Sequence, residues 1–156
     1  MDYWTDELAL DITAMKREIR HLIRPRETTI AFLEALKRHH AQVLLVTNAH
    51  PRSLELKMEE TGIGEYFDAI VSSHALHKPK EDPAFWPLLA REHPFEPART
   101  LLIDDSLSVL HSAQQHGIRW LLSIAKPDSQ GHARDTAPFP ALHTFDDIMP
   151  IPAVRA

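Results

Sequence analysis

The stretch VLLVTNAHP, residues 43–51, decides how this sequence folds. It opens with four consecutive apolar residues, Val43 to Val46, without alternating polar positions. Such a run is typical of a strand that is buried on both faces of a parallel sheet. Thr47 and Asn48 follow directly, and Pro51 stands where a helix is expected to begin. The stretch therefore predicts a strand–loop–helix unit with polar groups at the end of the strand.

The same order of strand, loop and helix recurs along the rest of the chain. Further strands are predicted at 68–72, 100–103 and 120–124. Helices are predicted at 51–61, 83–92 and 107–116, the first and last of which stop at Gly62 and Gly117. This alternation predicts an α/β fold in which helices cover both faces of a parallel sheet. The Pro-rich last thirty residues are expected to wrap the surface, with at most short elements near 145–149.

Two helices are predicted before the first strand. Residues 4–22 carry an apolar stripe with spacings of three and four: Trp4, Leu8, Ile12, Met15, Ile19 and Leu22. A second helix over 28–39 is expected to direct Ile30, Leu33 and Leu36 toward a core.

Composition restricts the class of protein. The 156 residues suffice for one compact domain, and the formal net charge of -5 argues against nucleic-acid binding through phosphate contacts. The absence of cysteine excludes disulfides and thiol catalysis. The apolar runs are too short to cross a membrane, and the acidic N-terminus lacks the features of a secretory signal. We therefore expect a cytoplasmic protein without nucleic-acid or membrane partners, while the oligomeric state stays open.

Polar residues collect where the predicted strands end, which is where open α/β sheets bind ligands. Thr47 and Asn48 follow the first strand, Lys78 and Lys80 lie in the loop after the second, and the pair Asp104–Asp105 follows the third. A hydroxyl with a backbone amide can hold a phosphoryl oxygen, a lysine neutralises its charge, and paired carboxylates bind Mg²⁺. Together they predict a phosphate site.

Each of these features also has a structural explanation. Thr-Asn after a strand is common in turns and helix caps, and lysines in a Pro-rich loop are usually solvated. Asp105 before Ser106 favours a helix start. The pairs His39–His40 and His74–His77 have no acidic residue nearby that completes a metal-ligand set, so we expect no metal role for them.

In this order the motifs resemble those of the haloacid dehalogenase-like (HAD) hydrolase superfamily. LLVTN (44–48) is similar to its second motif, KEDPAFW (80–86) to its third, and LLIDDS (101–106) to its acidic fourth. The strings DYW (2–4), TNAHP (47–51), PKED (79–82) and GIR (117–119) further resemble bacterial GMP/IMP 5′-nucleotidases, over roughly residues 2 to 130.

The resemblance implies an Mg²⁺-dependent phosphomonoesterase whose substrate is a purine nucleoside monophosphate. Thr47 and the Asn48 amide would bind the phosphoryl group, and Asp104 and Asp105 would hold the metal. Lys80 would neutralise the charge of the phosphoryl group and the nucleophile. Lys78 is the alternative lysine because Pro79 follows it, whereas the spacing to the aromatic Trp86 favours Lys80.

One departure concerns the first family motif, Asp-x-Asp-Gly-Thr, whose first aspartate is the nucleophile. No Asp-x-Asp occurs in the sequence. By resemblance, residues 1–22 match the end of a helical cap, 23–150 the core and 151–156 a tail, so the sequence resembles a family member that is truncated before its cap ends. The absent strand would lie centrally, between the strands that end at Thr47 and Asp104.

That absence has an expected cost in stability. Each unsatisfied buried backbone group costs about 1–3 kcal/mol, against a total stability of about 5–15 kcal/mol. We therefore expect residues 1–156 alone to be poorly stable, or the two flanking strands to close up or recruit another chain.

Three functions are compatible with the sequence. The first is a phosphomonoesterase that forms an aspartyl-phosphate. The second is an inactive remnant that binds Mg²⁺ and phosphate only. The third, a receiver-type phosphoacceptor domain, also uses an acidic pair, a threonine and a Lys-Pro. It fits less well because its acidic pair comes first in the chain and a separate acceptor aspartate follows.

Overall fold

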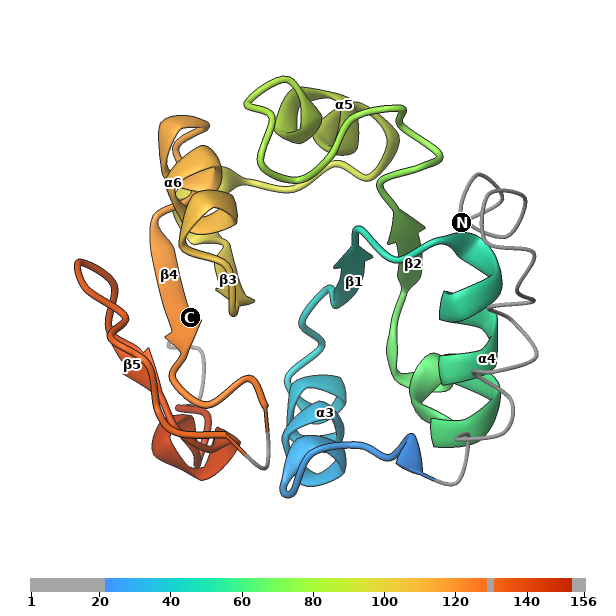
Figure 1. The fold of residues 1–156 in the computed structure, drawn as a ribbon, viewed down its shortest axis with the longest axis vertical. Helices are drawn as coiled ribbons and strands as arrows, with labels where there is room; N and C mark the ends of the chain where they lie inside the picture. Colours follow the sequence, from blue (N-terminus) through green and yellow to red (C-terminus); the bar gives the residue numbers. More distant parts are fainter. Residues whose placement is uncertain (1–21, 129–130, 153–156) are drawn as a thin grey trace. The chain divides into compact units, whose positions relative to one another are not determined.

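A computed structural model describes residues 22–128 and 131–152 (Figure 1). The chain forms two compact units, which divide between Ala75 and Leu76. The helix predicted over 4–22 and the cap remnant inferred for the same segment lie outside the described residues, apart from Leu22. Among the described residues, no helix is both long and apolar enough to cross a membrane.

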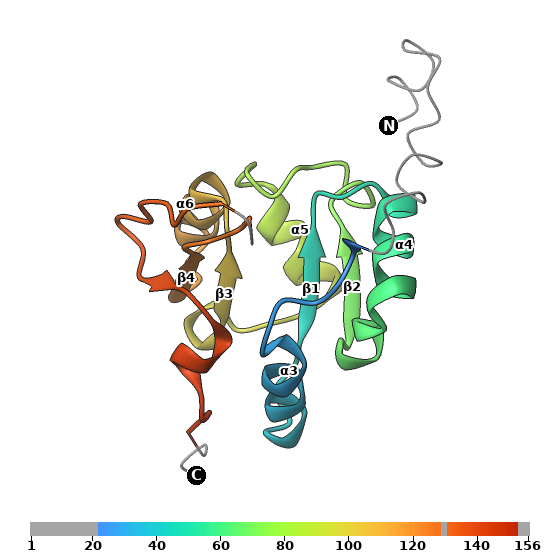
Figure 2. The same cartoon turned by 60° about the horizontal axis from the view of Figure 1, so that its bottom comes forward.

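The described part of the first unit contains two α-helices, one 3₁₀ helix and a two-stranded sheet. Its elements are α3 (Thr29–Arg38), β1 (Leu44–Thr47), α4 (Pro51–Thr61), the 3₁₀ helix η2 (Ile63–Tyr66) and β2 (Ala69–Ser72). The two strands run parallel (Figure 2), with Leu44 opposite Ala69 and Thr47 opposite Ser72. The first strand, its following helix and the second strand were therefore predicted correctly from the sequence.

The buried face of α3 differs from the prediction. Leu33 is buried as expected, but Ile30 is 44% exposed, and the other buried apolar residues are Phe32 and Ala35. The expectation for Ile30 was wrong because a constant spacing of three drifts around a helix that has 3.6 residues per turn. The observed face follows residues 32, 33 and 35 instead.

Helix α4 has a clear start and stop signal in the sequence. The His50 Nδ1 accepts a hydrogen bond from the Arg52 N–H at 3.3 Å, and Pro51 occupies the first turn, where no N–H is needed. At the other end, Gly62 adopts φ 65°, and its N–H donates to the Met58 carbonyl at 2.9 Å. These residues explain why the predicted bounds of this helix match the structure.

The second unit holds a three-stranded parallel sheet of order β3-β4-β5. Its elements are α5 (Phe85–Glu92), η3 (Pro97–Arg99), β3 (Leu101–Asp104), α6 (Leu107–Gln115), β4 (Trp120–Ile124), β5 (Ala141–Leu142) and η4 (Phe145–Ile148). Strand β5 was not predicted. It forms because β4 offers an edge, where the Ser123 N–H donates to the Pro140 carbonyl and the Ala125 N–H to the Leu142 carbonyl, both at 2.9 Å.

The core of the second unit is formed by α5 and α6 together with β3 and β4. Five large apolar side chains are almost fully buried there: Phe85, Trp86, Leu89, Val109 and Leu110. The Trp86 Nε1–H donates to the Ser112 Oγ at 2.9 Å, so the buried indole nitrogen is satisfied. This core anchors the segment just after Lys80 as well as the helix just after Asp105.

Strands β1 and β3 each have a single partner strand among the described residues. β1 pairs with β2, β3 pairs with β4, and the two sheets share no ladder. One edge of β1 and one edge of β3 carry no ladder partner in residues 22–128 and 131–152.

Candidate functional site

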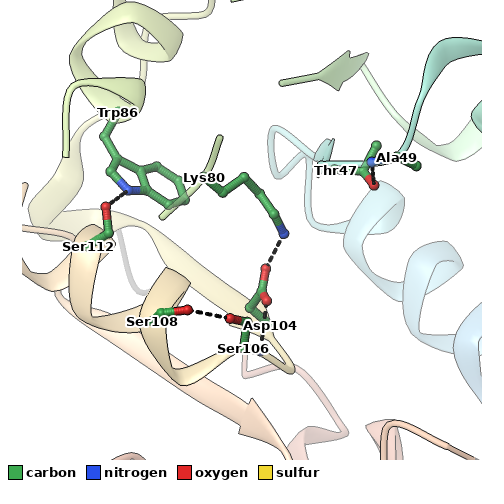
Figure 3. A network of polar contacts seen from close by, with 8 residues as sticks. All are labelled: Thr47, Ala49, Lys80, Trp86, Asp104, Ser106, Ser108 and Ser112. Carbon is green, nitrogen blue, oxygen red and sulfur yellow. Dashed lines mark hydrogen bonds and ion pairs between the residues drawn. The ribbon is translucent and has the colours of Figure 1, made fainter. Parts of the chain in front are cut away.

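The carboxyl end of β3 places an acidic residue against a lysine. Asp104 is the last residue of β3, and its Oδ2 accepts a hydrogen bond from the Lys80 Nζ at 2.5 Å (Figure 3). The two side chains are 11% and 7% exposed, for Lys80 and Asp104 respectively. Lys80 and Asp104, which are 24 positions apart in the sequence, are therefore brought together as a buried ion pair.

The second oxygen of the Asp104 carboxylate is also engaged. Its Oδ1 accepts a hydrogen bond from the Ser106 N–H at 3.0 Å. The Ser106 and Ser108 hydroxyls contact each other at 2.8 Å on the exposed side (Figure 3). Asp105 itself is exposed. The acidic pair thus combines one carboxylate held in place by the protein with one that faces solvent.

The two candidate lysines lie in different environments. Lys78 is exposed and forms an ion pair at 3.0 Å with Asp82, four residues further along the chain. The Ala84 N–H, and secondly Lys78, lower the pKa of the Asp82 carboxyl below its usual value of 3.8. Lys78 therefore contacts the turn that leads into α5, whereas Lys80 contacts Asp104 of the acidic pair.

The loop before α5 is bent so that Lys80 points inward. His77 adopts φ 53°, a left-handed conformation that turns the chain just before the lysines. The Asp82 N–H then donates to the Pro79 carbonyl at 3.0 Å, and the Phe85 N–H donates to the Asp82 carbonyl at 2.9 Å. Because Phe85 is fully buried, this pair of turns fixes the loop to the core of the second unit.

Thr47 and Asn48 lie in the first unit, at the carboxyl end of β1. The Thr47 Oγ1 accepts a hydrogen bond from the Ala49 N–H at 3.0 Å (Figure 3), and the Thr47 carbonyl accepts one from the Ser73 N–H at 2.8 Å. Asn48, which lies between Thr47 and Ala49 in the sequence, is exposed. A hydroxyl that accepts an N–H keeps its own proton, so Thr47 retains a donor.

A buried serine of the first unit was not identified from the sequence. The Ser72 Oγ donates to the Ala49 carbonyl at 2.7 Å, and it accepts a weaker contact from the His74 N–H at 3.4 Å. Ser72 ends β2 as Thr47 ends β1, and the two residues are register partners. The signal for Ser72 in the sequence is its position at the end of the strand predicted over 68–72.

The acidic pair fits Mg²⁺ in its chemistry. Mg²⁺ takes hard oxygen ligands and commonly binds through one or two carboxylates, with water and substrate phosphate completing the octahedron. Asp104 and Asp105 supply two such carboxylates. Within residues 22–128 and 131–152, no group of three or more His, Cys, Asp or Glu side chains is placed to hold a metal ion. A metal cage made of protein ligands alone is thus not found in the described part of the chain.

Comparison with known sequences points to one family. Residues 4–122 match the sequence profile of the haloacid dehalogenase-like hydrolases. The chain is 41% identical over 150 residues to the GMP/IMP nucleotidase YrfG of Escherichia coli K12, an alignment that covers 96% of this chain and 68% of the nucleotidase. It is 27% identical over 121 residues to phosphoglycolate phosphatase 1 of Pseudomonas aeruginosa, covering 76% of this chain and 43% of that protein.

Solved structures agree with the sequence comparison at the level of the fold. A HAD phosphatase from Thermococcus onnurineus superimposes with a TM-score of 0.75 at 21% identity, covering 94% of this chain and 67% of the phosphatase. The L-2-haloacid dehalogenase from Xanthobacter autotrophicus gives a TM-score of 0.62 at 19% identity, covering 81% and 52% of the two chains. The chain thus spans about half to two thirds of the length of these structures.

Proposed function

Because the chain belongs to the haloacid dehalogenase-like hydrolase family, we propose that it binds and hydrolyses purine nucleoside 5′-monophosphates such as GMP and IMP, with Mg²⁺ as cofactor. The substrate class rests on the 41% identity to a GMP/IMP nucleotidase. The site residues that we assign are Thr47, Asn48, Lys80, Asp104 and Asp105.

The buried pair of Lys80 and Asp104 carries the proposal. Removing an ammonium and a carboxylate from water costs several kcal/mol per ion, and their attraction returns that energy only in part. Such a pair adds little stability compared with apolar side chains of the same volume. Its position at the carboxyl end of a parallel strand favours a role in binding an anionic group and a cation.

Each assigned residue has a distinct task in binding a phosphate monoester. The Lys80 ammonium offsets the negative charge of the phosphoryl group, while the Thr47 hydroxyl and the Asn48 N–H donate hydrogen bonds to its oxygens. Asp104 and Asp105 would hold Mg²⁺, which supplies charge neutralisation when it is bound. One oxygen of Asp104 binds the Lys80 ammonium, and the other accepts a hydrogen bond from the Ser106 N–H. Asp104 therefore holds the lysine beside the proposed metal-binding carboxylates.

A second candidate function is binding without hydrolysis. By family resemblance the nucleophile is the first aspartate of an Asp-x-Asp motif, and these 156 residues contain none. A chain with the phosphate and Mg²⁺ ligands but without this nucleophile is expected to hold GMP and release no phosphate. This function is favoured if the 156 residues act alone.

Release of phosphate from GMP and IMP, with and without Mg²⁺, tests hydrolysis. Equilibrium binding of GMP in Mg²⁺ tests the second function in parallel. Lys80→Met is the informative variant and Lys78→Met the matched control, because only Lys80 contacts Asp104. We expect Lys80→Met to weaken GMP binding and Lys78→Met to leave it unchanged. Absence of Mg²⁺-dependent GMP binding by the unmodified chain would contradict both functions.

A further inference from the structure

We propose that Ser72 is a positioning residue, which holds the phosphate-binding turn Thr47–Ala49 in the geometry needed for a phosphoryl group. This inference rests on the proposed function, because it assumes that Thr47 and Asn48 bind phosphate. It adds a residue from a different strand, and one that would act through the turn without touching the ligand.

The peptide units around Ala49 are held from two sides. The Ala49 N–H donates to the Thr47 Oγ1 at 3.0 Å, within the turn itself. The Ala49 carbonyl accepts from the Ser72 Oγ at 2.7 Å, across a sequence separation of 23 residues. The first contact closes the turn locally, and the second ties it to the end of β2. The Ser72 bond is therefore the side-chain contact that helps to fix the orientation of the turn relative to the sheet.

The surroundings of Ser72 explain why its hydroxyl can act in this way. Ser72 is 8% exposed and ends β2 directly opposite Thr47 in the parallel register. The adjacent Ser73 N–H donates to the Thr47 carbonyl at 2.8 Å, so the two strand ends are connected by backbone and by side chain. Because Ser72 itself is buried, its partly buried hydrogen bond to the Ala49 carbonyl competes less with water than an exposed one would.

A pair of imidazoles strengthens the connection between the two strand ends. The His50 and His74 rings contact each other edge to face, with centroids 5.3 Å apart and an interplanar angle of 76°. His50 follows Ala49 and caps α4, while the His74 N–H lies 3.4 Å from the Ser72 Oγ. The loop after β1 and the loop after β2 are thus joined at two adjacent places.

Ser72 would affect binding by ordering the turn Thr47–Ala49 before the ligand arrives. The Thr47 hydroxyl and the Asn48 N–H converge on one ligand only when the turn has a single conformation. If Ser72 fixes that conformation before the ligand arrives, the entropy of ordering is not lost during binding. Loss of the Ser72 hydroxyl should therefore weaken binding although no contact to the ligand is removed.

The test is the affinity of the full chain for inorganic phosphate, measured by NMR titration of the amide signals of Thr47 to His50. Ser72→Ala is expected to weaken this affinity about three- to tenfold, the effect of one lost hydrogen bond. Ser72→Thr keeps a hydroxyl and should restore most of the affinity. The matched control is Thr136→Ala, which removes another buried hydroxyl that donates to a backbone carbonyl, that of Phe139 at 3.0 Å.

The outcomes separate the inference from the proposed function. If the unmodified chain does not bind phosphate at all, the proposed function fails, and the inference fails with it. If the unmodified chain binds phosphate and Ser72→Ala binds it equally well, only the inference is wrong. Equal weakening by Ser72→Ala and Thr136→Ala would also overturn it, because a general loss of stability would then explain both. Should Ser72→Ala not fold, Ser72→Cys keeps the volume with a weaker donor and should weaken binding in the same direction.

Discussion

The two units that carry the candidate site residues are stabilised in different ways. The unit with Lys80 and Asp104 contains the most deeply buried large side chains of the described residues, among them Trp86 and Leu110. In the unit with Thr47, no residue of β1 is fully buried, and Ile70 of β2 is 38% exposed. The lysine and the acid are therefore placed by apolar packing, whereas the threonine turn is placed mainly by hydrogen bonds between strand ends. The two halves should respond differently to mutation.

The largest effect that we expect concerns the chain as a whole. Strands β1 and β3 each present an edge without a ladder partner in the described residues, and Leu101 of β3 is exposed. We predict that the unfolding free energy of the 156 residues lies below the usual range of about 5–15 kcal/mol, or that the chain associates with other chains through these edges. Thermal unfolding combined with analytical ultracentrifugation checks this. A cooperative transition of a monomer at an ordinary mesophilic temperature would show that the open edges cost little.

The next largest effect contrasts the two cores. Trp86→Ala should lower the free energy of unfolding by about 3–5 kcal/mol, because it empties a fully buried position. Leu45→Ala in the half-buried β1 should cost less, about 1–2 kcal/mol. Urea unfolding of both variants measures the difference. If Leu45→Ala lowers the free energy of unfolding as much as Trp86→Ala does, the difference in burial between the two units does not translate into a difference in stability.

A third prediction concerns the buried ion pair. Asp104→Ala should destabilise the chain by about 3–5 kcal/mol, since it leaves the Lys80 ammonium buried without its carboxylate. The double variant Lys80→Met, Asp104→Leu should recover most of that loss, because two apolar side chains replace the pair. Urea unfolding of Asp104→Ala, of Lys80→Met, of Asp104→Leu and of the double variant tests this coupling. Independent, additive effects of the two substitutions would mean that the pair does not act as a unit.

The smallest effect is a local pH dependence in η4. The Thr144 N–H and, secondly, the His143 N–H donate to the Asp147 carboxylate and lower its pKa below the usual 3.8. The ionised carboxylate therefore favours the folded turn above that pH, and this contribution is lost as the pH falls through the lowered pKa of Asp147. Hydrogen exchange of the His143 and Thr144 amides, followed downward from about pH 5, should show falling protection relative to the intrinsic exchange rate at each pH in the unmodified chain. In Asp147→Asn that pH dependence should be absent.

Much of the fold was predictable because local signals agree with it. Apolar runs of three or four residues predicted the strands, and Gly62 and Gly117, both left-handed in the structure, predicted two helix ends. Strand β5 was missed because its two residues form a strand only through hydrogen bonds to β4, which no local pattern contains. Ile30 was misplaced because the predicted spacing of three residues drifts around a helix that has 3.6 residues per turn.

The candidate site was predictable in its residue types but not in its geometry. Position after a predicted strand indicated Thr47, Asp104 and both Lys78 and Lys80, and the spacing to Trp86 in the family motif favoured Lys80. The sequence could not show that Lys80 is buried while Lys78, two residues earlier, is exposed, because that depends on the turn at His77 and on the buried Phe85. Ser72 was missed although it ends a predicted strand, and its partner Ala49, 23 residues away, could not be inferred from the sequence.

Two tryptophans of the second unit differ in exposure, so that tryptophan fluorescence can follow the folding of this unit. Trp86 is 1% exposed and hydrogen-bonded to Ser112, whereas Trp120 is 55% exposed, with the Arg119 guanidinium 5.0 Å from its ring centroid. Trp86 should therefore fluoresce at shorter wavelength than Trp120 and be protected from a dissolved collisional quencher such as iodide. In a variant that carries Phe at positions 4 and 120, the emission of Trp86 alone would follow the packing of α5 on α6. The natural sequence thus contains its own fluorophore at the core that places Lys80 and Asp104.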